Sequence, residues 1–282
     1  MLLKVTEVEH YTERLFRFRT ERPTAFKFSA GEFTMVGIEN VETVIPKRAY
    51  SITSGPYDDF LEFLSIKVQD GPLTSVLQNI KIGDKIFVGD KPTGTLTLAN
   101  LELGGNLWLL ATGTGIAPYI SLLRDPELFN SFQNINVVWT TRLIAEQSCF
   151  KEFISTTASN FYASTTRENS ELEGRIQLLI ENKVILQDAN PDNDKIMICG
   201  SMDFNNEMKK YFNDTRYFDL YNNGKISVSD NNGSKGMIYL QPNTKVELTK
   251  DKELMISNVI NIKKNKDKEH NKNYKLVSLN KK

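Results

Sequence analysis

Hydrophobic and polar residues alternate in short runs over the first third of the chain, and these runs are rich in aromatic and β-branched side chains. Turn residues separate the runs at Pro23, Gly31, Gly55–Pro56 and Gly83–Asp84. This pattern is typical of short strands joined by tight turns, and it predicts an antiparallel barrel of about six strands. The expected strands are Leu3–Val8, Arg14–Arg19, Glu32–Val36, Ala49–Thr53, Phe60–Lys67 and Lys85–Val88.

One amphipathic segment interrupts these strands. Apolar residues recur at helical spacing from Leu73 to Ile80, which predicts a helix over Pro72–Ile80. The start of this helix, Gly71–Ser75, would present free backbone N–H groups and the positive end of the helix dipole, which together suit a phosphate. The same residues also fit an ordinary helix start, with a proline in the first turn and a hydroxyl side chain as its cap.

A different pattern begins after residues 94–105, which we interpret as a hinge between two domains. Residues 107–111 form a continuous apolar run, suited to a parallel strand that is covered on both faces. Further strands are expected at 135–139 and 195–199, with a helix around 120–123. Strands that alternate with helices indicate βαβ units and a parallel sheet.

The composition changes again from about Tyr217 onward, where asparagine and lysine become frequent. Turns are expected at Asn222–Gly224 and Asn231–Gly233. Three short segments within this region still fit strands: 225–228, 237–240 and 254–257. The charged run from Lys263 to Lys272 offers too little apolar surface to offset its ordering entropy, so the end of the chain is expected to be disordered.

Length and charge narrow the function classes. A chain of 282 residues favours two domains, and its 35 basic and 35 acidic side chains cancel, so no overall field attracts nucleic acid or an anionic membrane. The start of the chain lacks a basic segment followed by an apolar one, and no apolar run approaches about 18 residues. We therefore expect a cytoplasmic protein with no membrane span and no nucleic-acid partner.

Cysteine and histidine are scarce. Cys149 and Cys199 are the only cysteines, and His10 and His270 are the only histidines. An iron–sulfur cluster normally takes four closely spaced thiolates, and two distant histidines offer little to a zinc site or a histidine-based triad. We expect no metal site, so the chemistry must come from a bound cofactor.

Two short motifs carry residues suited to a nucleotide. On one expected strand, Arg48 and Tyr50 share a face, whereas Ser51 points the other way unless a local bend re-aims it. Further on, Gly113–Pro118 reads Gly-Thr-Gly-Ile-Ala-Pro between an apolar strand and a helix, which is the context of a dinucleotide-binding turn. The turn lacks the third glycine of the usual fingerprint, which counts against an ordinary Rossmann dehydrogenase.

Three arginines and the end of the last apolar strand complete the candidate set. Arg142, Arg167 and Arg175 can each bond a phosphate bidentately, although any one of them could equally be a solvated surface residue. Cys199–Ser201 ends a strand at the edge where open α/β sheets bind ligands. A cysteine at the end of an apolar strand is usually buried packing, and nothing in the sequence indicates a covalent nucleophile.

The order and spacing of Arg48–Ser51, Gly113–Pro118 and Cys199–Ser201 resemble the ferredoxin–NADP reductases, most closely the bacterial flavodoxin/ferredoxin type, over roughly residues 1–212. The resemblance implies a two-domain fold, in which an antiparallel β-barrel that binds FAD is followed by an α/β Rossmann-like parallel sheet that binds NADP(H). The implied FAD domain is 1–98 and the implied NADP domain is 104–216. Residues 217–282 do not match the short tail of the bacterial type, and they form an atypical Asn/Lys-rich C-terminal extension.

The resemblance also assigns residues to each cofactor. Arg48 would bind the FAD pyrophosphate, Tyr50 would stack on the isoalloxazine, and Ser51 would donate a hydrogen bond near the flavin N5. Cys199 would face the nicotinamide, so the implied catalytic residues are Tyr50, Ser51 and Cys199. The other implied FAD contacts are Ala49, Ser65, Ile66, Pro72, Leu73, Thr74 and Thr114. The implied NADP contacts are Gly113, Gly115, Thr141, Arg142, Thr166, Arg167, Arg175, Gly200 and Ser201, with Arg167 and Arg175 at the 2′-phosphate.

The implied activity is that of a ferredoxin/flavodoxin–NADP(+) reductase, which exchanges hydride between NADP(H) and FAD and single electrons with ferredoxin or flavodoxin. Close stacking of the two rings lets hydride pass without an acid–base residue. One alternative is the reductase component of an oxygenase or another electron-transfer chain, which shares the same fold. A second, from a different class, is a flavin-binding interaction or sensor protein without turnover, which NADPH would not bleach.

Overall fold

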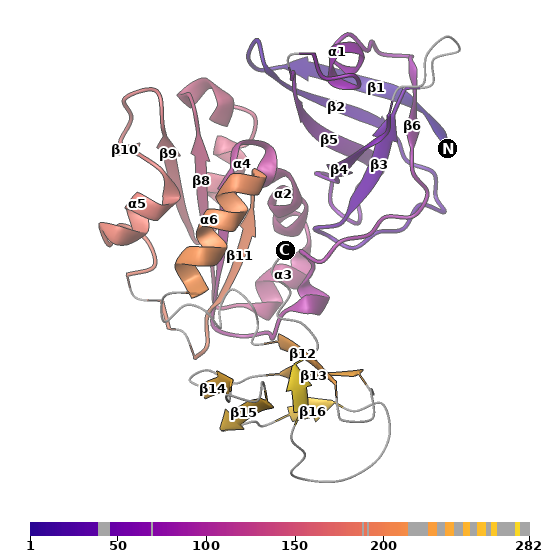
Figure 1. The fold of residues 1–282 in the computed structure, drawn as a ribbon. Helices are drawn as coiled ribbons and strands as arrows, with labels where there is room; N and C mark the ends of the chain where they lie inside the picture. Colours follow the sequence, from indigo (N-terminus) through magenta and orange to yellow (C-terminus); the bar gives the residue numbers. More distant parts are fainter. Residues whose placement is uncertain are drawn as a thin grey trace. The chain divides into compact units, whose positions relative to one another are not determined.

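The computed structural model describes residues 1–38, 46–68, 70–187, 189–190, 192–213, 225–229, 235–239, 245–248, 253–257, 261–263 and 274–276. The chain divides into two compact units, one of Met1–Asp188 with Ile196–Asn206 and the other of Ala189–Lys195 with Glu207–Lys282. The first unit contains a barrel and most of an α/β sheet (Figure 1).

Six antiparallel strands build the barrel (Figure 1). They run in the order β4-β3-β6-β1-β2-β5, and a bridge between Ile52 and Phe63 joins the β4 edge to β5, which closes the barrel. The strands are β1 Leu2–His10, β2 Leu15–Glu21, β3 Phe33–Gly37, β4 Arg48–Ser51, β5 Phe60–Ile66 and β6 Lys85–Val88. Each of the six predicted strands overlaps one of these, so the predicted barrel is confirmed.

Alternation along the strands fills the barrel with aromatic rings. In β2, Phe16 and Phe18 are fully buried, whereas Arg17 between them is only partly buried. Phe63 of β5 joins the same cluster, and Tyr50 packs against it. Burial of each such side chain contributes about 1.5–3 kcal/mol, so the interior of the barrel supports the strand that carries Tyr50.

The helix expected over Pro72–Ile80 is shorter than predicted. The structure has α1 at Thr74–Leu77, without a side-chain cap. Side-chain amides of Gln78 and Asn79 donate to the Ser75 carbonyl, at 3.1 and 3.0 Å, and such local bonds compete with a continuing helix.

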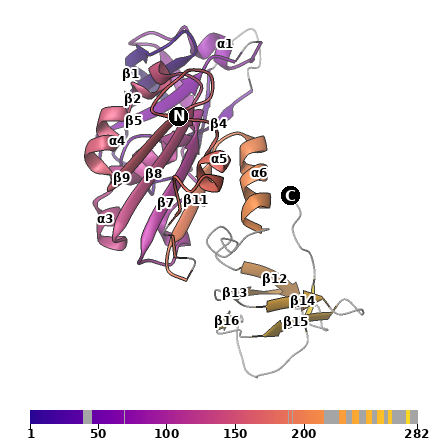
Figure 2. The same ribbon diagram turned by 90° about the vertical axis from the view of Figure 1, so that its left-hand side faces the viewer.

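The second half of the first unit is a five-stranded sheet in the order β10-β9-β8-β7-β11, so the predicted parallel sheet is confirmed. Helices α3 and α4 lie on one face of this sheet and α5 lies on the other (Figure 2), and α2 contacts both α3 and α4. The strands are β7 Asn106–Thr112, β8 Asn134–Thr141, β9 Asn160–Thr165, β10 Leu172–Glu173 and β11 Lys195–Cys199. The helices are α2 Ala117–Leu123, α3 Pro126–Ser131, α4 Lys151–Thr157, α5 Ile176–Glu181 and α6 Met202–Asn213, with short 3-10 turns η1 Leu98–Asn100, η2 Gly113–Ile116 and η3 Ile144–Gln147.

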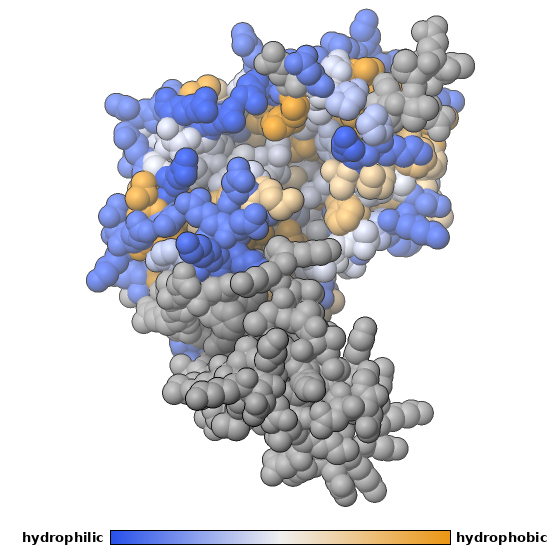
Figure 3. All heavy atoms as spheres, viewed as in Figure 1, coloured by the Kyte–Doolittle hydropathy of each residue, from blue (hydrophilic) through white to orange (hydrophobic). Residues whose placement is uncertain are grey.

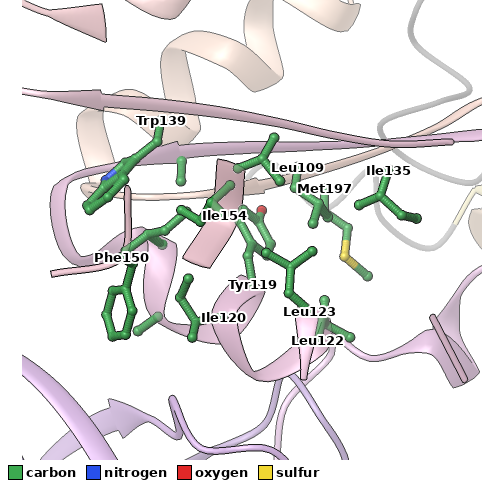
Figure 4. Close-up of a cluster of buried hydrophobic side chains, with 14 of the residues drawn as sticks. Leu109, Tyr119, Ile120, Leu122, Leu123, Ile135, Trp139, Phe150, Ile154 and Met197 are labelled. Atoms are coloured by element: carbon green, nitrogen blue, oxygen red, sulfur yellow. The ribbon is translucent and has the colours of Figure 1, made fainter. Parts of the chain in front are cut away.

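One hydrophobic core joins the sheet to the barrel. Figure 4 shows Tyr119 and Leu123 of α2 between that helix and the strands that carry Leu109 and Ile135. Barrel residues Leu15, Ala30 and Leu64 belong to the same buried cluster. Hydrophilic residues cover much of the outside of the α/β part in the view of Figure 3. The barrel and the sheet therefore fold around shared apolar surface.

The last part of the chain contains a second six-stranded sheet, in the order β14-β15-β17-β12-β13-β16, and all of its described pairs are antiparallel. Its strands are β12 Lys225–Ser229, β13 Lys235–Tyr239, β14 Lys245–Leu248, β15 Glu253–Ser257, β16 Asn261–Lys263 and β17 Tyr274–Leu276. Strands β12, β13 and β15 overlap the three segments expected from the sequence. The expected turns at 222–224 and 231–233, and most of the charged run, lie outside the described residues. Among the described helices, none is long and apolar enough to cross a membrane.

Candidate active site

Tyr50 of β4 is held by contacts inside the barrel. Its ring lies 6.3 Å from that of Phe18 and 6.4 Å from that of Phe63, both edge-on. Its hydroxyl is 3.0 Å from Ser65 Oγ of β5, and burial raises the pKa of Tyr50, so the phenol stays protonated at neutral pH. Closure of the barrel between β4 and β5 thus brings together two of the residues that the sequence assigned to one ligand.

The other residues of β4 lie closer to solvent. Arg48 and Ala49 are exposed, and Arg48 forms no ion pair with any described residue. Pairing with β3 runs without a register shift to Ser51, which places Ser51 on the opposite face from Arg48 and Tyr50. The chain then bridges to β5 at Ile52, so the motif ends at a corner of the barrel. Ile66, at the end of β5, is 37% exposed.

The turn before α1 folds back on itself. The Thr74 hydroxyl donates to the Val68 carbonyl at 3.3 Å and accepts the Val68 N–H at 3.2 Å, while Pro72 is exposed and Leu73 is buried. The N–H groups of Leu73 and Thr74 have no acceptor among the described residues. Because α1 has only four residues, these two free donors matter more for an anion than a helix dipole does.

Close backbone approach joins the glycine turn to the end of β11. A Cβ added to Gly115 would lie 2.2 Å from the Cys199 carbonyl oxygen, and one added to Gly200 would lie 2.1 Å from Thr112 Oγ1. Gly113 has a φ of +52°, the left-handed region that favours glycine. These glycines let two motifs that are far apart in the sequence meet at the carboxyl ends of β7 and β11.

A tryptophan that the sequence reasoning missed fixes this turn. Trp139 Nε1 donates to the Gly113 carbonyl at 2.9 Å. The signal that was available is a tryptophan near the carboxyl end of an apolar strand, where its N–H needs a partner. Thr114 in the same turn is half-buried.

Cys199 and Ser201 have different surroundings. Burial raises the pKa of the half-buried Cys199 thiol to about 11, so this group is a protonated thiol at neutral pH and not a ready nucleophile. The Ser201 hydroxyl accepts the N–H of Phe204 at 3.2 Å and so caps the start of α6.

Backbone bonds gather the three candidate arginines at the ends of β8, β9 and β10. The Arg167 N–H donates to the Arg142 carbonyl at 3.0 Å, and the Gly174 N–H donates to the Thr165 carbonyl at 2.8 Å, next to Arg175. All three arginines are exposed, and among the described residues none of them has an ion-pair partner. Their guanidinium groups are therefore free to bind an anion.

Two threonines near these arginines differ in what they can offer. Thr141 is buried, and its hydroxyl donates to the Leu143 carbonyl at 2.9 Å and accepts from Gln147 Nε2 at 3.0 Å, so it holds the loop after β8. Thr166 is exposed, and its N–H donates to the Thr141 carbonyl at 3.0 Å.

The predicted residues form two groups that adjoin each other. Because the sheet is parallel, the glycine turn and the arginines share one edge, and one to three strand spacings of about 4.8 Å separate them, up to roughly 15 Å for Arg175 after β10, a span suited to an extended dinucleotide. Strand β5, which carries Ser65 and Ile66, contacts η2, which carries Gly113–Gly115. Within the described residues, no group of three or more His, Cys, Asp or Glu side chains could hold a metal ion.

Comparison with known proteins gives consistent matches. Residues 1–97 match the family described as the oxidoreductase FAD-binding domain. The chain is 40% identical over 223 residues to a flavodoxin/ferredoxin–NADP reductase of Rhodobacter capsulatus, covering 73% of this chain and 83% of that protein. It is 38% identical over 216 residues to a ferredoxin–NADP reductase of Azotobacter vinelandii, covering 70% and 83%. A solved ferredoxin NADP+ reductase from Neisseria gonorrhoeae with bound FAD and NADP gives a TM-score of 0.72 at 29% identity, covering 76% of this chain and 90% of that one.

Proposed function

Because this chain belongs to the ferredoxin–NADP reductase family, of the flavodoxin/ferredoxin type, we propose that the residues described above divide the family's reaction between the barrel and the α/β sheet. The protein is an FAD-dependent oxidoreductase that exchanges hydride with NADP(H) and single electrons with ferredoxin or flavodoxin. In the proposed division, residues 1–98 bind FAD, residues 104–216 bind NADP(H), and residues 217–282 are an extension outside both.

The proposed FAD site uses the free groups of the barrel. Arg48 would pair with the pyrophosphate, helped by the free N–H groups of Leu73 and Thr74. The Tyr50 ring, braced by the bond to Ser65, would stack on the isoalloxazine. Ala49, Ile66 and Pro72 would line the same surface. These exposed and unpaired groups are what an anionic dinucleotide requires, so the residues fit the cofactor.

Ser51 and Thr114 have more local roles in this proposal. Ser51 lies at the barrel corner, where the chain stops pairing with β3 and bridges to β5. Its hydroxyl would therefore reach the flavin from the end of the strand and not from the face that carries Tyr50. Thr114 would meet the flavin from the glycine turn, because η2 contacts β5.

The proposed NADP(H) site runs along the edge of the sheet. Gly113, Gly115, Gly200 and Ser201 would bring the backbone close to the nicotinamide end, with Cys199 facing the ring. At the other end, Arg167 and Arg175 would bond the 2′-phosphate, and Arg142 with Thr166 would line the adenine side. Thr141 contributes by holding the loop after β8 and not through its hydroxyl, which is already bonded on both sides.

When bound, FAD accepts a hydride and passes on its electrons one at a time. The residues of this chain orient the two cofactors, bring their rings into contact and exclude water. Cys199, with its raised pKa, fills space beside the nicotinamide as a neutral thiol. Tyr50 likewise keeps its proton, so neither residue supplies acid–base catalysis in this proposal.

Two approaches carry the proposal: Gly115 lies against Cys199, and η2, which carries Gly115, contacts the strand that holds Ser65, so residues proposed for the two cofactors lie near one another. Reductase components of oxygenases share this fold, but the 40% identity to a flavodoxin/ferredoxin–NADP reductase favours ferredoxin or flavodoxin as the electron carrier. The cytoplasmic location expected from the sequence stays a prediction.

The test is the cofactor content of the purified full-length protein, followed by electron delivery. We expect a yellow protein with about one FAD per chain, in which FMN does not replace FAD because the pyrophosphate contacts would be lost. With NADPH present, this protein should reduce added ferredoxin or flavodoxin. A colourless protein that takes up no FAD on reconstitution would contradict the assigned FAD site.

A further inference from the structure

A buried carboxylate interrupts the apolar pattern of β5. Glu62 lies between Leu61 and Phe63, and its side chain is fully buried. Its Oε2 is 2.7 Å from Arg19 Nε and 3.2 Å from Arg17 Nη1, both of the neighbouring strand β2. A buried carboxylate is costly unless it is paired, and these contacts satisfy one of its two oxygens.

The second oxygen of Glu62 is bound from the α/β side. Arg124, directly after α2, places Nη1 2.9 Å from Glu62 Oε1 and 3.2 Å from the Thr53 carbonyl. One turn earlier, the Ser121 hydroxyl donates to the Ser54 carbonyl at 2.7 Å. Two side chains at the end of α2 therefore fasten this helix to the barrel.

Close packing supports the same junction. A Cβ added to Gly55 would lie 2.8 Å from Arg124 Cβ, so the glycine lets the end of α2 approach the barrel. The Arg124 guanidinium also lies over the Phe153 ring, 5.5 Å from its centroid. The pair is thus held from several sides, and Arg124 has little freedom to adopt another rotamer.

The two ends of α2 connect the junction to the proposed cofactor sites. The helix follows η2, the glycine turn, and all seven of its residues are buried, so it acts as a rigid rod of about 10 Å. On the barrel side, Thr53 and Ser54 follow the β4 motif, and Glu62 lies on the strand that carries Ser65. The part of the barrel that would hold the flavin therefore binds the helix that directly follows the glycine turn.

We propose that the Arg124–Glu62 ion pair is a positioning device that holds the glycine turn in register with the flavin for hydride transfer. Neither residue belongs to the proposed cofactor contacts, so both are positioning residues that act through α2 and β5. The inference rests on the proposed function, because the ion pair would determine how the nicotinamide ring stacks on the isoalloxazine ring. Reacting atoms need a separation of about 3–3.5 Å, and a misplacement of about 1 Å can cost on the order of 100-fold in rate.

The charge arrangement makes Arg124 the better residue to change. Without Arg124, Glu62 keeps Arg17 and Arg19, so the barrel does not acquire an unpaired buried charge. Without Glu62, the partners of Arg124 among the described residues are the more distant Asp58, at 3.6 Å, the Thr53 carbonyl and the Phe153 ring. Arg124→Met should therefore loosen the junction while the barrel stays intact.

The experiment compares the full-length protein with Arg124→Met, Arg124→Lys and a control, Arg14→Met, which removes an exposed arginine. FAD content and the affinity for 2′,5′-ADP, a fragment that binds without the nicotinamide, should stay within about twofold in every variant. In Arg124→Met, flavin reduction by NADPH in single-turnover mixing should slow by about 10- to 100-fold. The long-wavelength absorbance of stacked nicotinamide and flavin should fade, and amide hydrogen exchange in α2 should rise. Arg124→Lys, which keeps the charge, should recover most of the rate.

Unchanged reduction rate and unchanged exchange in Arg124→Met would overturn the inference. If Arg124→Met loses FAD or fails to fold, Gly55→Ala decides the question, because it crowds Arg124 without removing a charge. Slower reduction in Gly55→Ala with FAD retained would support the inference. A normal rate of reduction in Gly55→Ala would show that the ion pair only stabilises the fold, and the inference would be refuted. If the unmodified protein is not reduced by NADPH, it is the proposed function that fails, and no variant is needed to show it.

Discussion

The barrel and the α/β sheet prepare for their ligands in opposite ways. In the barrel, Tyr50 and Ser65 already bond each other, and the Tyr50 ring rests on buried phenylalanines. On the sheet, Arg167 and Arg175 are exposed with no ion-pair partner among the described residues. The proposed isoalloxazine contacts, Tyr50 and Ser65, are thus part of the folded core, whereas the proposed 2′-phosphate contacts are free charges at the edge of the sheet.

This difference predicts which property a substitution in each region should change. A change in the barrel site alters packing, so it should appear in stability as well as in FAD retention. A change among the arginines removes only a ligand contact, so it should appear in NADPH affinity and leave the fold alone.

The largest effect is expected for the double variant Arg167→Ala with Arg175→Ala. Each charge-assisted contact contributes about 1.5–3 kcal/mol, and each 1.4 kcal/mol is about tenfold, so kcat/KM for NADPH should fall by on the order of 100-fold or more. Turnover of NADH should change little, and the unfolding midpoint should stay where it is. Equal use of both nicotinamides by the unmodified protein would contradict the assignment.

Gly115→Ala should have the next largest effect. The added Cβ would lie 2.2 Å from the Cys199 carbonyl oxygen, which is backbone and cannot rotate away as a side chain could. We expect reduction of bound FAD by NADPH to slow by about 100-fold, with FAD still held by the barrel. Gly113→Ala is the matched control, since no atom lies within 4 Å of its added Cβ and only its positive φ is strained. A Gly115→Ala rate no lower than that of Gly113→Ala would show that the close approach is not needed.

Tyr50→Phe should reveal the barrel side of the contrast. The change keeps the ring but leaves Ser65 Oγ, in a residue that is only 2% exposed, without its partner, which costs about 1–3 kcal/mol of stability. Urea unfolding should show this loss, and FAD affinity should fall by less than about tenfold because stacking remains. Tyr57→Phe, at a residue that is 80% exposed, serves as the control and should change neither quantity.

The smallest effect concerns Cys199. Its folded pKa is about 11, above the ordinary value of 9.0, because burial disfavours the thiolate. The stability that this neutral thiol contributes is fully present below about pH 9 and is lost as the pH rises toward 11. Urea unfolding at pH 8 and pH 10 should therefore show a smaller loss in Cys199→Ala than in the unmodified protein. NADPH reduction should not rise between pH 7 and 9, and a rise in step with thiolate formation would contradict the inert role.

The sequence predicted the barrel strands well because alternation and turn residues are local signals. It overestimated α1, since side-chain bonds from Gln78 and Asn79 to the Ser75 carbonyl compete with a continuing helix, and periodicity alone does not show them. It missed β9, whose sequence Asn-Phe-Tyr-Ala-Ser-Thr lacks a continuous apolar run and becomes a strand by pairing with β8.

The same holds for the candidate site: motifs of neighbouring residues could be predicted from the sequence, whereas contacts between residues far apart in the chain could not. The glycine pattern of residues 113–118 was readable, but its approach to Cys199 depends on strand order, which only the fold provides. Glu62 is a charge inside an apolar run, but the sequence analysis did not single it out. Its partner Arg124, 62 residues away, could not be identified without the packing of α2 against the barrel.

The central claim is that NADPH, bound at the sheet edge, gives its hydride to FAD held by the barrel. Anaerobic titration of the purified yellow protein with NADPH, followed by the flavin absorbance, tests it most directly. We predict that nearly equimolar NADPH bleaches the flavin and that NADH does so far less readily. A flavin that dithionite reduces but excess NADPH leaves yellow would contradict the account.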